Sequence, residues 1–289
     1  MKTLRVISFI ILCAVVPLSP AMAQQDVPLS QNAALRYWSA FAEMQDSAIT
    51  EQQAKEFHAI LDGTAPYSDL KYRDLAEKNK TAVETMARGT ALPNCDWGVD
   101  YALGSDAPVE YVRKAMILGR LNVLYALHLL KNGDKDGAVR ALAAGVRFSH
   151  DVANDGTLFA TLAAKSLLIA HFKTIAGVEH VEHLTAAQKS ELQKALNVLG
   201  PEGLDWESAV KREYGFPRTG LDAKNSSALA QISTAFQNAV NNPSALPQLQ
   251  QTIANAPQAV RELIPNPQRV LDEKRDLADQ LRQMRSLLQ

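Results

Sequence analysis

Three long apolar segments between residues 108 and 176 constrain the fold of this chain more than any other feature of its sequence. In the first, residues 115–130, only Arg120, Asn122 and His128 are clearly polar. A helix that is apolar on almost every side has to be buried against several neighbours, so this segment is predicted to be the central helix. The turn Lys-Asn-Gly-Asp at residues 131–134 supplies a glycine to end this helix and an aspartate to cap the next. The sequence therefore predicts a helical hairpin.

The second segment of this core places small residues on one narrow face. A face of small side chains suits close contact between helices. A third apolar helix is predicted over residues 158–176, after the break at residues 154–156. The residues of the small face recur at helical spacing and are Ala138, Ala141, Leu142, Gly145, Val146, Ser149 and Val152.

The first 23 residues have the features of a secretory signal peptide. A positively charged start precedes an apolar run over residues 6–16, and the small-residue pattern Ala-Met-Ala closes the segment. The apolar run is about half as long as a membrane-spanning helix, so a retained anchor is the weaker interpretation. We expect cleavage between Ala23 and Gln24 and a mature protein that is periplasmic or secreted, with no insertion in the membrane.

Charge and cysteine content narrow the class of protein further. The chain has 30 basic and 31 acidic residues and a formal net charge of −1, so no basic surface for nucleic acid is indicated. Of the two cysteines, Cys13 falls within the predicted signal peptide, which leaves Cys95 alone in the mature chain. No internal disulfide can then form, although the expected compartment would permit one, and the apolar core has to hold the fold.

Residues 24–215 are predicted to form the main helical domain around the hairpins at 108–176. A long helix introduced by Ser68 is expected to run to Arg88. An amphipathic helix, capped by Ser30 and half buried, is predicted over residues 31–44. Its apolar face carries Leu35, Trp38, Phe41 and Ala42.

Residues 216–289 are predicted to form a C-terminal helical extension. Residues 225–260 contain no Asp, Glu, Lys or Arg, and Pro243, Pro247 and Pro257 divide this stretch into separate helices. An amphipathic helix follows to the last residue. Its apolar positions have nearly heptad spacing and are Val270, Leu277, Leu281, Met284 and Leu288.

The whole chain is predicted to be all-α. No stretch shows the alternation of apolar and polar residues that is typical of strands. We expect an irregular multi-helix bundle or a short array of helical hairpins, without a sheet. Residues 129–142, Leu-Leu-Lys-Asn-Gly-Asp-Lys-Asp-Gly-Ala-Val-Arg-Ala-Leu, resemble the helix-turn-helix junction of tetratricopeptide (TPR) repeats. No second copy follows at about 34 residues, so a regular solenoid is not predicted.

A wider resemblance covers roughly residues 30–180. Asn-Ala-Ala-Leu-Arg-Tyr-Trp at residues 32–38, Leu-Pro-Asn-Cys-Asp-Trp-Gly at residues 92–98 and the central hairpin resemble an uncharacterised family of secreted, all-helical bacterial proteins. The resemblance implies a fold and a compartment and brings no known activity.

The cysteine loop, residues 91–101, is the chemically densest part of the chain. It could line a pocket or supply a nucleophilic thiol, which would need a base or a positive field nearby. Alternatively, Trp97 pins the loop and Cys95 is a small buried apolar group. The side chains concerned are Cys95, Asp96, Trp97, Asp100 and Tyr101.

Cationic residues of the central hairpin are a second candidate group. They would form structural ion pairs, with Asp96 or Asp100 as buried partners, or bind an anionic ligand. The residues are Arg113, Arg120, His128, Arg147 and His150.

His180 and His183 are weak candidates for a metal site. Their spacing can put both rings on one helix face, but two histidines are an incomplete site, and a solvated helix start is the simpler interpretation. The chain has none of the nucleophile-elbow, zinc-protease or nucleotide-binding motifs. No cofactor is predicted.

Two functions from different classes are consistent with these features. The leading hypothesis is an exported helical scaffold or binding protein that presents a groove or face to a protein or peptide. The alternative is a hydrolase-like enzyme with its site at the cysteine loop and the hairpin cations. A cleft in which Cys95 meets a histidine would favour the enzyme, and an open helical groove would favour the binding protein.

Overall fold

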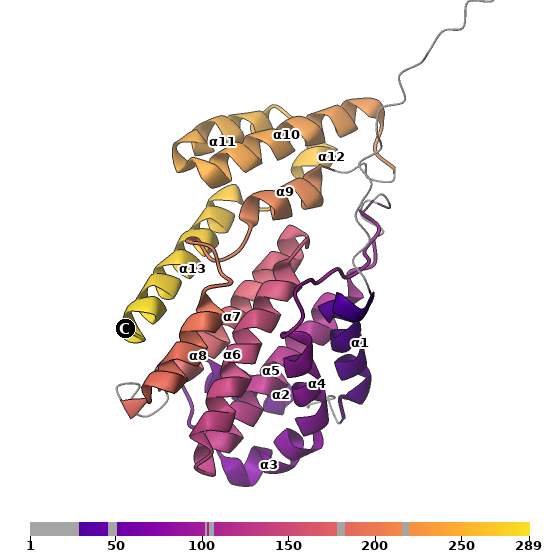
Figure 1. The fold of residues 1–289 in the computed structure, drawn as a ribbon. Coiled ribbons are helices and arrows are strands. Elements are labelled where there is room, and N and C mark those ends of the chain that lie inside the picture. The colour runs from indigo at the N-terminus through magenta and orange to yellow at the C-terminus, as the bar shows by residue number, and fades with distance from the viewer. Residues whose placement is uncertain (1–28, 46–50, 102, 104–106, 178–182, 216–219) are drawn as a thin grey trace, which may run out of the picture.

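The computed structural model describes residues 29–45, 51–101, 103, 107–177, 183–215 and 220–289. Within these residues the regular structure is helical and no strand forms, which confirms the predicted all-α multi-helix bundle (Figure 1). The helices are α1 (Ala33–Glu43), α2 (Glu51–Leu61), α3 (Asp69–Lys78), α4 (Lys80–Gly89), α5 (Glu110–Lys131), α6 (Lys135–Ala153), α7 (Leu158–Gly177), α8 (Ala186–Leu196), α9 (Trp206–Tyr214), α10 (Ala223–Asn241), α11 (Leu246–Ala254), α12 (Gln258–Arg261) and α13 (Pro267–Leu287).

Helices α5, α6 and α7 form the centre of the bundle. Gly133 has a φ of +83° and Asp134 caps α6 by accepting from Gly137 N at 2.8 Å, so the predicted turn is the one observed. The small-residue face predicted for α6 is buried at every position. Among the described helices, α7 alone is long and apolar enough to cross a membrane, but 72% of that window is buried within the bundle.

A buried polar pair lies between these three helices. Asn122 and His171 are fully buried. Asn122 Nδ2 donates to the Ala141 carbonyl at 2.9 Å and lies 3.1 Å from His171 Nε2, while His171 Nδ1 lies 2.7 Å from the Leu167 carbonyl. Since a carbonyl can only accept, Nδ1 carries the hydrogen and Nε2 accepts from Asn122. Burial lowers the pKa of His171 to about 4, so the ring is neutral near neutral pH.

Gly145 of α6 leaves the space that this pair occupies. A Cβ atom at position 145 would lie 2.0 Å from His171 Nε2 and 2.4 Å from Asn122 Nδ2. Both distances are far inside van der Waals contact, so any larger residue would displace the pair. Glycine is therefore required here by the close approach of α6 to its two neighbours.

Helix α1 buries Phe41 of the predicted face, but the rest of its buried side is a different one. Leu35 and Trp38 are 43% and 37% exposed, and Ala42 is exposed as well. The buried side combines small alanines, which let α1 approach α4 closely, with the rings of Tyr37 and Phe41, which fill the core. The cap is Asn32 and not Ser30. The buried residues are Ala33, Ala34, Tyr37, Ala40 and Phe41.

The long helix predicted after Ser68 is broken at Asn79 into α3 and α4. The Asn79 side chain is buried and pairs with the main chain of Gln45, accepting from its N at 2.8 Å and donating to its carbonyl at 2.9 Å. A polar side chain that is buried has to find such partners, and these lie after α1. The break is set by this contact, which sequence periodicity does not reveal.

The C-terminal helices follow the predicted pattern. Pro243, Pro247 and Pro257 lie at the starts of the separate helical pieces after α10. Helices α10 and α11 form a layer across one end of the bundle, and α13 runs from it along α8 (Figure 1). The five apolar positions predicted for the terminal helix are all buried. The capping box of Thr185 and Gln188 at the start of α8 is also present.

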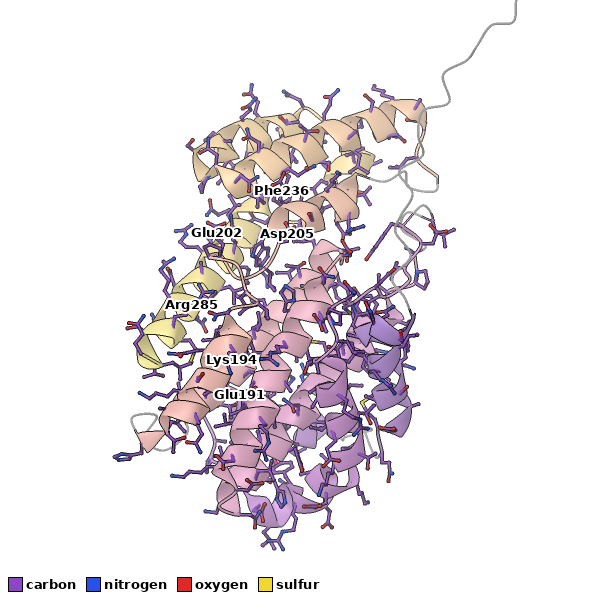
Figure 2. All side chains as sticks on the ribbon, viewed as in Figure 1. Glu191, Lys194, Glu202, Asp205, Phe236 and Arg285 are labelled. Carbon is purple, nitrogen blue, oxygen red and sulfur yellow. The ribbon has the colours of Figure 1, made fainter. Side chains whose placement is uncertain are left out.

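Helix α13 is fastened to its neighbours by buried cations. Lys165 of α7 pairs with two carboxylates of α13, which lie on Glu273 and Asp276. Lys274 donates to the Val240 carbonyl of α10 at 2.5 Å. Arg285 lies beside α8 in Figure 2 and donates to a carbonyl of the loop that follows α8, 2.8 Å away. One apolar cluster accordingly includes residues of α1 and of α13.

Candidate functional site

The cysteine loop is anchored to the core by its own central residues. Trp97 donates from Nε1 to the Asp151 carbonyl at 2.8 Å and stacks on Tyr111, with ring centroids 4.2 Å apart. Asn32 Nδ2 donates to the Asp96 carbonyl at 2.8 Å, and Asp96 N donates back to Asn32 Oδ1 at 2.9 Å. The loop is therefore a packed edge of the bundle.

The thiol of Cys95 faces the inside of this edge. The residue is 7% exposed, and its thiol donates to the Asp151 carbonyl oxygen, with Sγ 3.8 Å from that oxygen. Burial, together with the charge of the Asp151 carboxylate, raises the pKa of the thiol far above its usual range. A nucleophilic cysteine needs the opposite shift, so Cys95 in this position is a packing group.

The remaining loop residues point to α6 and α9. Asp96 Oδ1 accepts from Gly98 N at 2.8 Å, which fixes the bend of the loop. Tyr101 donates to the Asp155 carbonyl at 2.7 Å, and the Arg212 guanidinium lies 5.2 Å above its ring. Asp100 is exposed. These contacts join the loop to the α6–α7 turn and do not converge on a cavity.

Behind the loop, a chain of three polar side chains ends at His150. The Tyr37 hydroxyl donates to Oδ2 of Asp151, and Oδ1 of Asp151 lies 3.3 Å from His150 Nδ1. Burial and the neighbouring carboxylate raise the pKa of Tyr37, so its phenol stays protonated. The cavity that His150 lines with Ser208 measures about 60 Å³. Ligand pockets measure roughly 300–1,000 Å³, so this cavity has no room for a substrate.

The hairpin arginines do not form the pairs with the loop that the sequence led us to consider. Arg113 lies 3.7 Å from Glu110 on its own helix, and Arg147 lies 3.9 Å from Glu191 of α8. Arg120 is half buried, and burial lowers its pKa. Among the residues that the structure describes, no carboxylate pairs with it.

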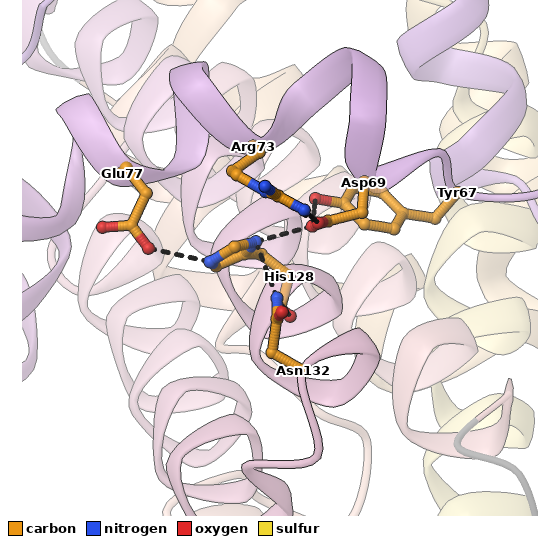
Figure 3. Close-up of polar contacts among 6 residues, drawn as sticks. All are labelled: Tyr67, Asp69, Arg73, Glu77, His128 and Asn132. Atoms are coloured by element: carbon orange, nitrogen blue, oxygen red, sulfur yellow. Dashed lines mark hydrogen bonds and ion pairs between the residues drawn. The ribbon is translucent and has the colours of Figure 1, made fainter.

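His128 lies at the centre of a polar cluster between α3 and α5 (Figure 3). Its Nδ1 is 2.6 Å from Asp69 Oδ1, and its Nε2 is 2.8 Å from Glu77 Oε1. Arg73 donates to Asp69 Oδ2 at 2.7 Å. The hydrogen bond from His128, followed by that from Arg73, lowers the pKa of Asp69 to about 2.

Sequence reasoning named His128 but missed its partners. Asp69, Arg73 and Glu77 recur four residues apart, which puts them on one face of α3, and this spacing was the available signal. The two carboxylates contact opposite nitrogens of the ring, so they do not converge on one point where a metal ion could bind. The cluster fastens α3 to α5.

The structure does not test the histidine pair at residues 180 and 183. His180 lies outside the described residues, and His183 is exposed. Elsewhere in the described part of the chain, no group of three or more His, Cys, Asp or Glu side chains is arranged to hold a metal ion.

A groove between α7 and α13 is large enough for a ligand. Its volume is about 360 Å³. Leu162 and Ile169 of α7 and Val270 of α13 supply apolar walls, and Lys165, paired with α13, contributes to the lining. Of these groove residues the sequence named Val270 alone, as an apolar position of the terminal helix and not as part of a site. The available signal was spacing: residues 159, 162, 166 and 169 recur three or four apart, which puts them on one face of the helix.

An exposed aromatic side chain extends this apolar surface. Phe159 is 58% exposed and lies one helical turn before Leu162, on the same face of α7. A large aromatic side chain in water beside a groove is the arrangement that protein interfaces favour for an anchor. We call Phe159, Leu162, Ser166 and Ile169, together with the α13 wall, the α7 groove.

A second groove lies between α10 and α11 in the charge-free segment. Its volume is about 470 Å³, and its lining includes Gln231, Thr252, Asn255 and the cation Lys224. The apolar members are small, Ala228 among them. Without an aromatic or branched aliphatic anchor, this groove offers much less apolar area to a ligand than the α7 groove.

Comparison of the chain with family models, curated proteins and solved structures found no match.

Proposed function

We propose that the protein is an exported helical binding protein that holds a helical segment of a partner protein in the α7 groove. The observation that carries the proposal is the groove itself, about 360 Å³ in volume, with the exposed Phe159 one turn beyond its wall. Grooves between helices bind amphipathic helices by taking apolar side chains spaced three and four residues apart. Export rests on the signal-peptide features of residues 1–23.

The α7 groove fits a partner helix better than the cysteine loop fits a substrate. Leu162 and Ile169 offer branched aliphatic side chains that the rest of the described chain covers only in part, beside the buried Val270 of the α13 wall. Covering such side chains contributes about 25 cal/mol for each Å² of apolar surface removed from water. By contrast, Cys95 is closed off and the cavity at His150 measures about 60 Å³.

A library of displayed amphipathic helices, with leucine at positions i, i+3, i+7 and i+10 and random residues elsewhere, tests the proposal. Helices recovered on the wild-type protein should bind about tenfold or more weakly to an Ile169→Glu variant, because the change removes an apolar contact and puts a carboxylate where the bound helix would exclude water. Leu35→Glu is the matched control, since Leu35 is an exposed aliphatic residue on α1. Recovery of no helix, or of helices with the same affinity for the wild type and for Ile169→Glu, would contradict the assignment.

A further inference from the structure

Arg120 is a half-buried cation without a counter-charge among the residues that the structure describes. Of the other half-buried arginines in the described part of the chain, Arg147 has Glu191, Arg212 pairs with Asp155, and Arg285 donates to main-chain carbonyls. Arg120 has no such acceptor among the described residues. A guanidinium that is partly removed from water and left unpaired is costly, and an incoming carboxylate would relieve that cost.

Arg120 borders the α7 groove. Helices α5 and α7 run parallel, because contacts between them advance along both helices in the same direction. Gly119 faces Leu167, which would lie 2.6 Å from a Cβ added at position 119, and three residues later Asn122 contacts His171. Arg120 follows Gly119 and Ser166 precedes Leu167, each by a rotation of about 100°. In parallel helices, these opposite rotations bring both residues to the same side of the pair. Ser166 lines the groove, and Arg120, which is outside the lining itself, is placed by this geometry on the same side of the α5–α7 pair, away from α13.

The other described charges on this surface pair with one another and do not offset Arg120. Lys165 is paired with the carboxylates of both Glu273 and Asp276. On the α13 wall, Arg269 extends into solvent with its side chain 82% exposed, and its distance from Glu273 is 3.8 Å. An apolar groove with an arginine on each side suits an amphipathic helix with acidic flanks.

We propose that the α7 groove selects acidic helices, in which a carboxylate beside the apolar stripe pairs with Arg120. This inference rests on the proposed function and names the chemistry of the partner. A guanidinium binds a carboxylate through two parallel hydrogen bonds, so the pair fixes the register of the helix as well as its charge.

A membrane surface is the main rival occupant. An apolar face with basic edges also suits an anionic bilayer. The groove favours a helix for two reasons. The α13 wall with Val270 and Glu273 makes the surface concave, and a bilayer laid over it would have to cover the Glu273 carboxylate. Vesicle binding therefore enters the test as a result that would overturn the inference.

The test repeats the library selection and compares the residues recovered beside the leucines on the wild type and on Arg120→Glu. Acidic residues should be enriched on the wild type. A synthetic peptide from the strongest helix should bind Arg120→Glu about tenfold more weakly, and a Glu→Lys change in that peptide should restore affinity for this variant. Arg140→Glu on α6 is the control, because Arg140 is an exposed arginine away from the groove. If Arg120→Glu does not fold, Arg120→Gln should still weaken the acidic peptide selectively.

The possible failures are distinguishable. Helices recovered without acidic enrichment, or equal losses in the Arg120 and Arg140 variants, would overturn the acidic preference and leave the groove intact. No helix above the Ile169→Glu background would overturn the proposed function itself. Sedimentation with phosphatidylglycerol vesicles that requires Arg120, in the absence of any recovered helix, would assign the surface to the membrane.

Discussion

The buried imidazole of His171 leads to a quantitative prediction about stability in acid. In the unfolded chain its pKa is 6.5, and in the fold burial lowers it to about 4. Because the folded pKa is the lower of the two, the unfolded state binds the proton first as the pH falls. The contribution of His171 is complete above pH 6.5, declines between pH 6.5 and 4, and levels off below that. A difference of about 2.5 pKa units corresponds to a loss of about 3 kcal/mol.

Urea unfolding of the wild type and of His171→Gln at several pH values between 7.5 and 4 measures this loss. Glutamine can donate to the Leu167 carbonyl and accept from Asn122, but it does not titrate. The variant is expected to be less stable than the wild type at pH 7.5 and to approach or exceed it near pH 4. Subtracting one pH profile from the other removes the contributions of the other histidines, of which the chain has five.

Parallel pH profiles for the two proteins would refute the reasoning. They would mean that the imidazole in the fold has water or a carboxylate within reach, so that protonation costs nothing. An NMR titration of the His171 ring that moves near pH 6.5 in the folded protein would lead to the same conclusion.

Three further predictions concern the core, the thiol and export. Leu142 is fully buried, so Leu142→Ala should lower the free energy of unfolding by about 2–5 kcal/mol, and a urea melt showing a loss under about 0.5 kcal/mol would contradict its place in the core. Cys95 should react slowly with a thiol reagent in the native protein and rapidly in denaturant, because its thiol is buried; stoichiometric labelling of the native monomer would show an accessible thiol instead. N-terminal sequencing of the exported protein should start at or near Gln24, and an intact Met1 in the membrane fraction would rule out cleavage.

Local sequence signals predicted the parts of the fold that depend on local chemistry. The turn before α6 needs only a left-handed glycine and a capping aspartate, and Gly133 and Asp134 supply them next to each other. The buried face of α6 is readable because small residues recur along it. In each case, residues a few positions apart decide the outcome.

The features that the sequence did not reveal depend on residues distant in the chain. Trp38 was placed on the buried side of α1 by its spacing, but the buried side is the one that carries Tyr37 and the alanines against α4. Asn79 ends α3 because it meets Gln45. The partners of His128 lie on α3, 51 and 59 positions away. The α7 groove likewise exists only because α13 returns to α7.

Helix α13 does more than close the groove, because its other contacts reach the layer of α10 and α11. An occupant that holds α13 against α7 adds its binding free energy to every local opening in which the two helices separate. Lys274 carries that restraint to the Val240 carbonyl at the end of α10. Amide hydrogens near this end of α10 should therefore exchange more slowly when the groove is filled, although the occupant does not touch them, and the distant layer becomes a reporter of occupancy.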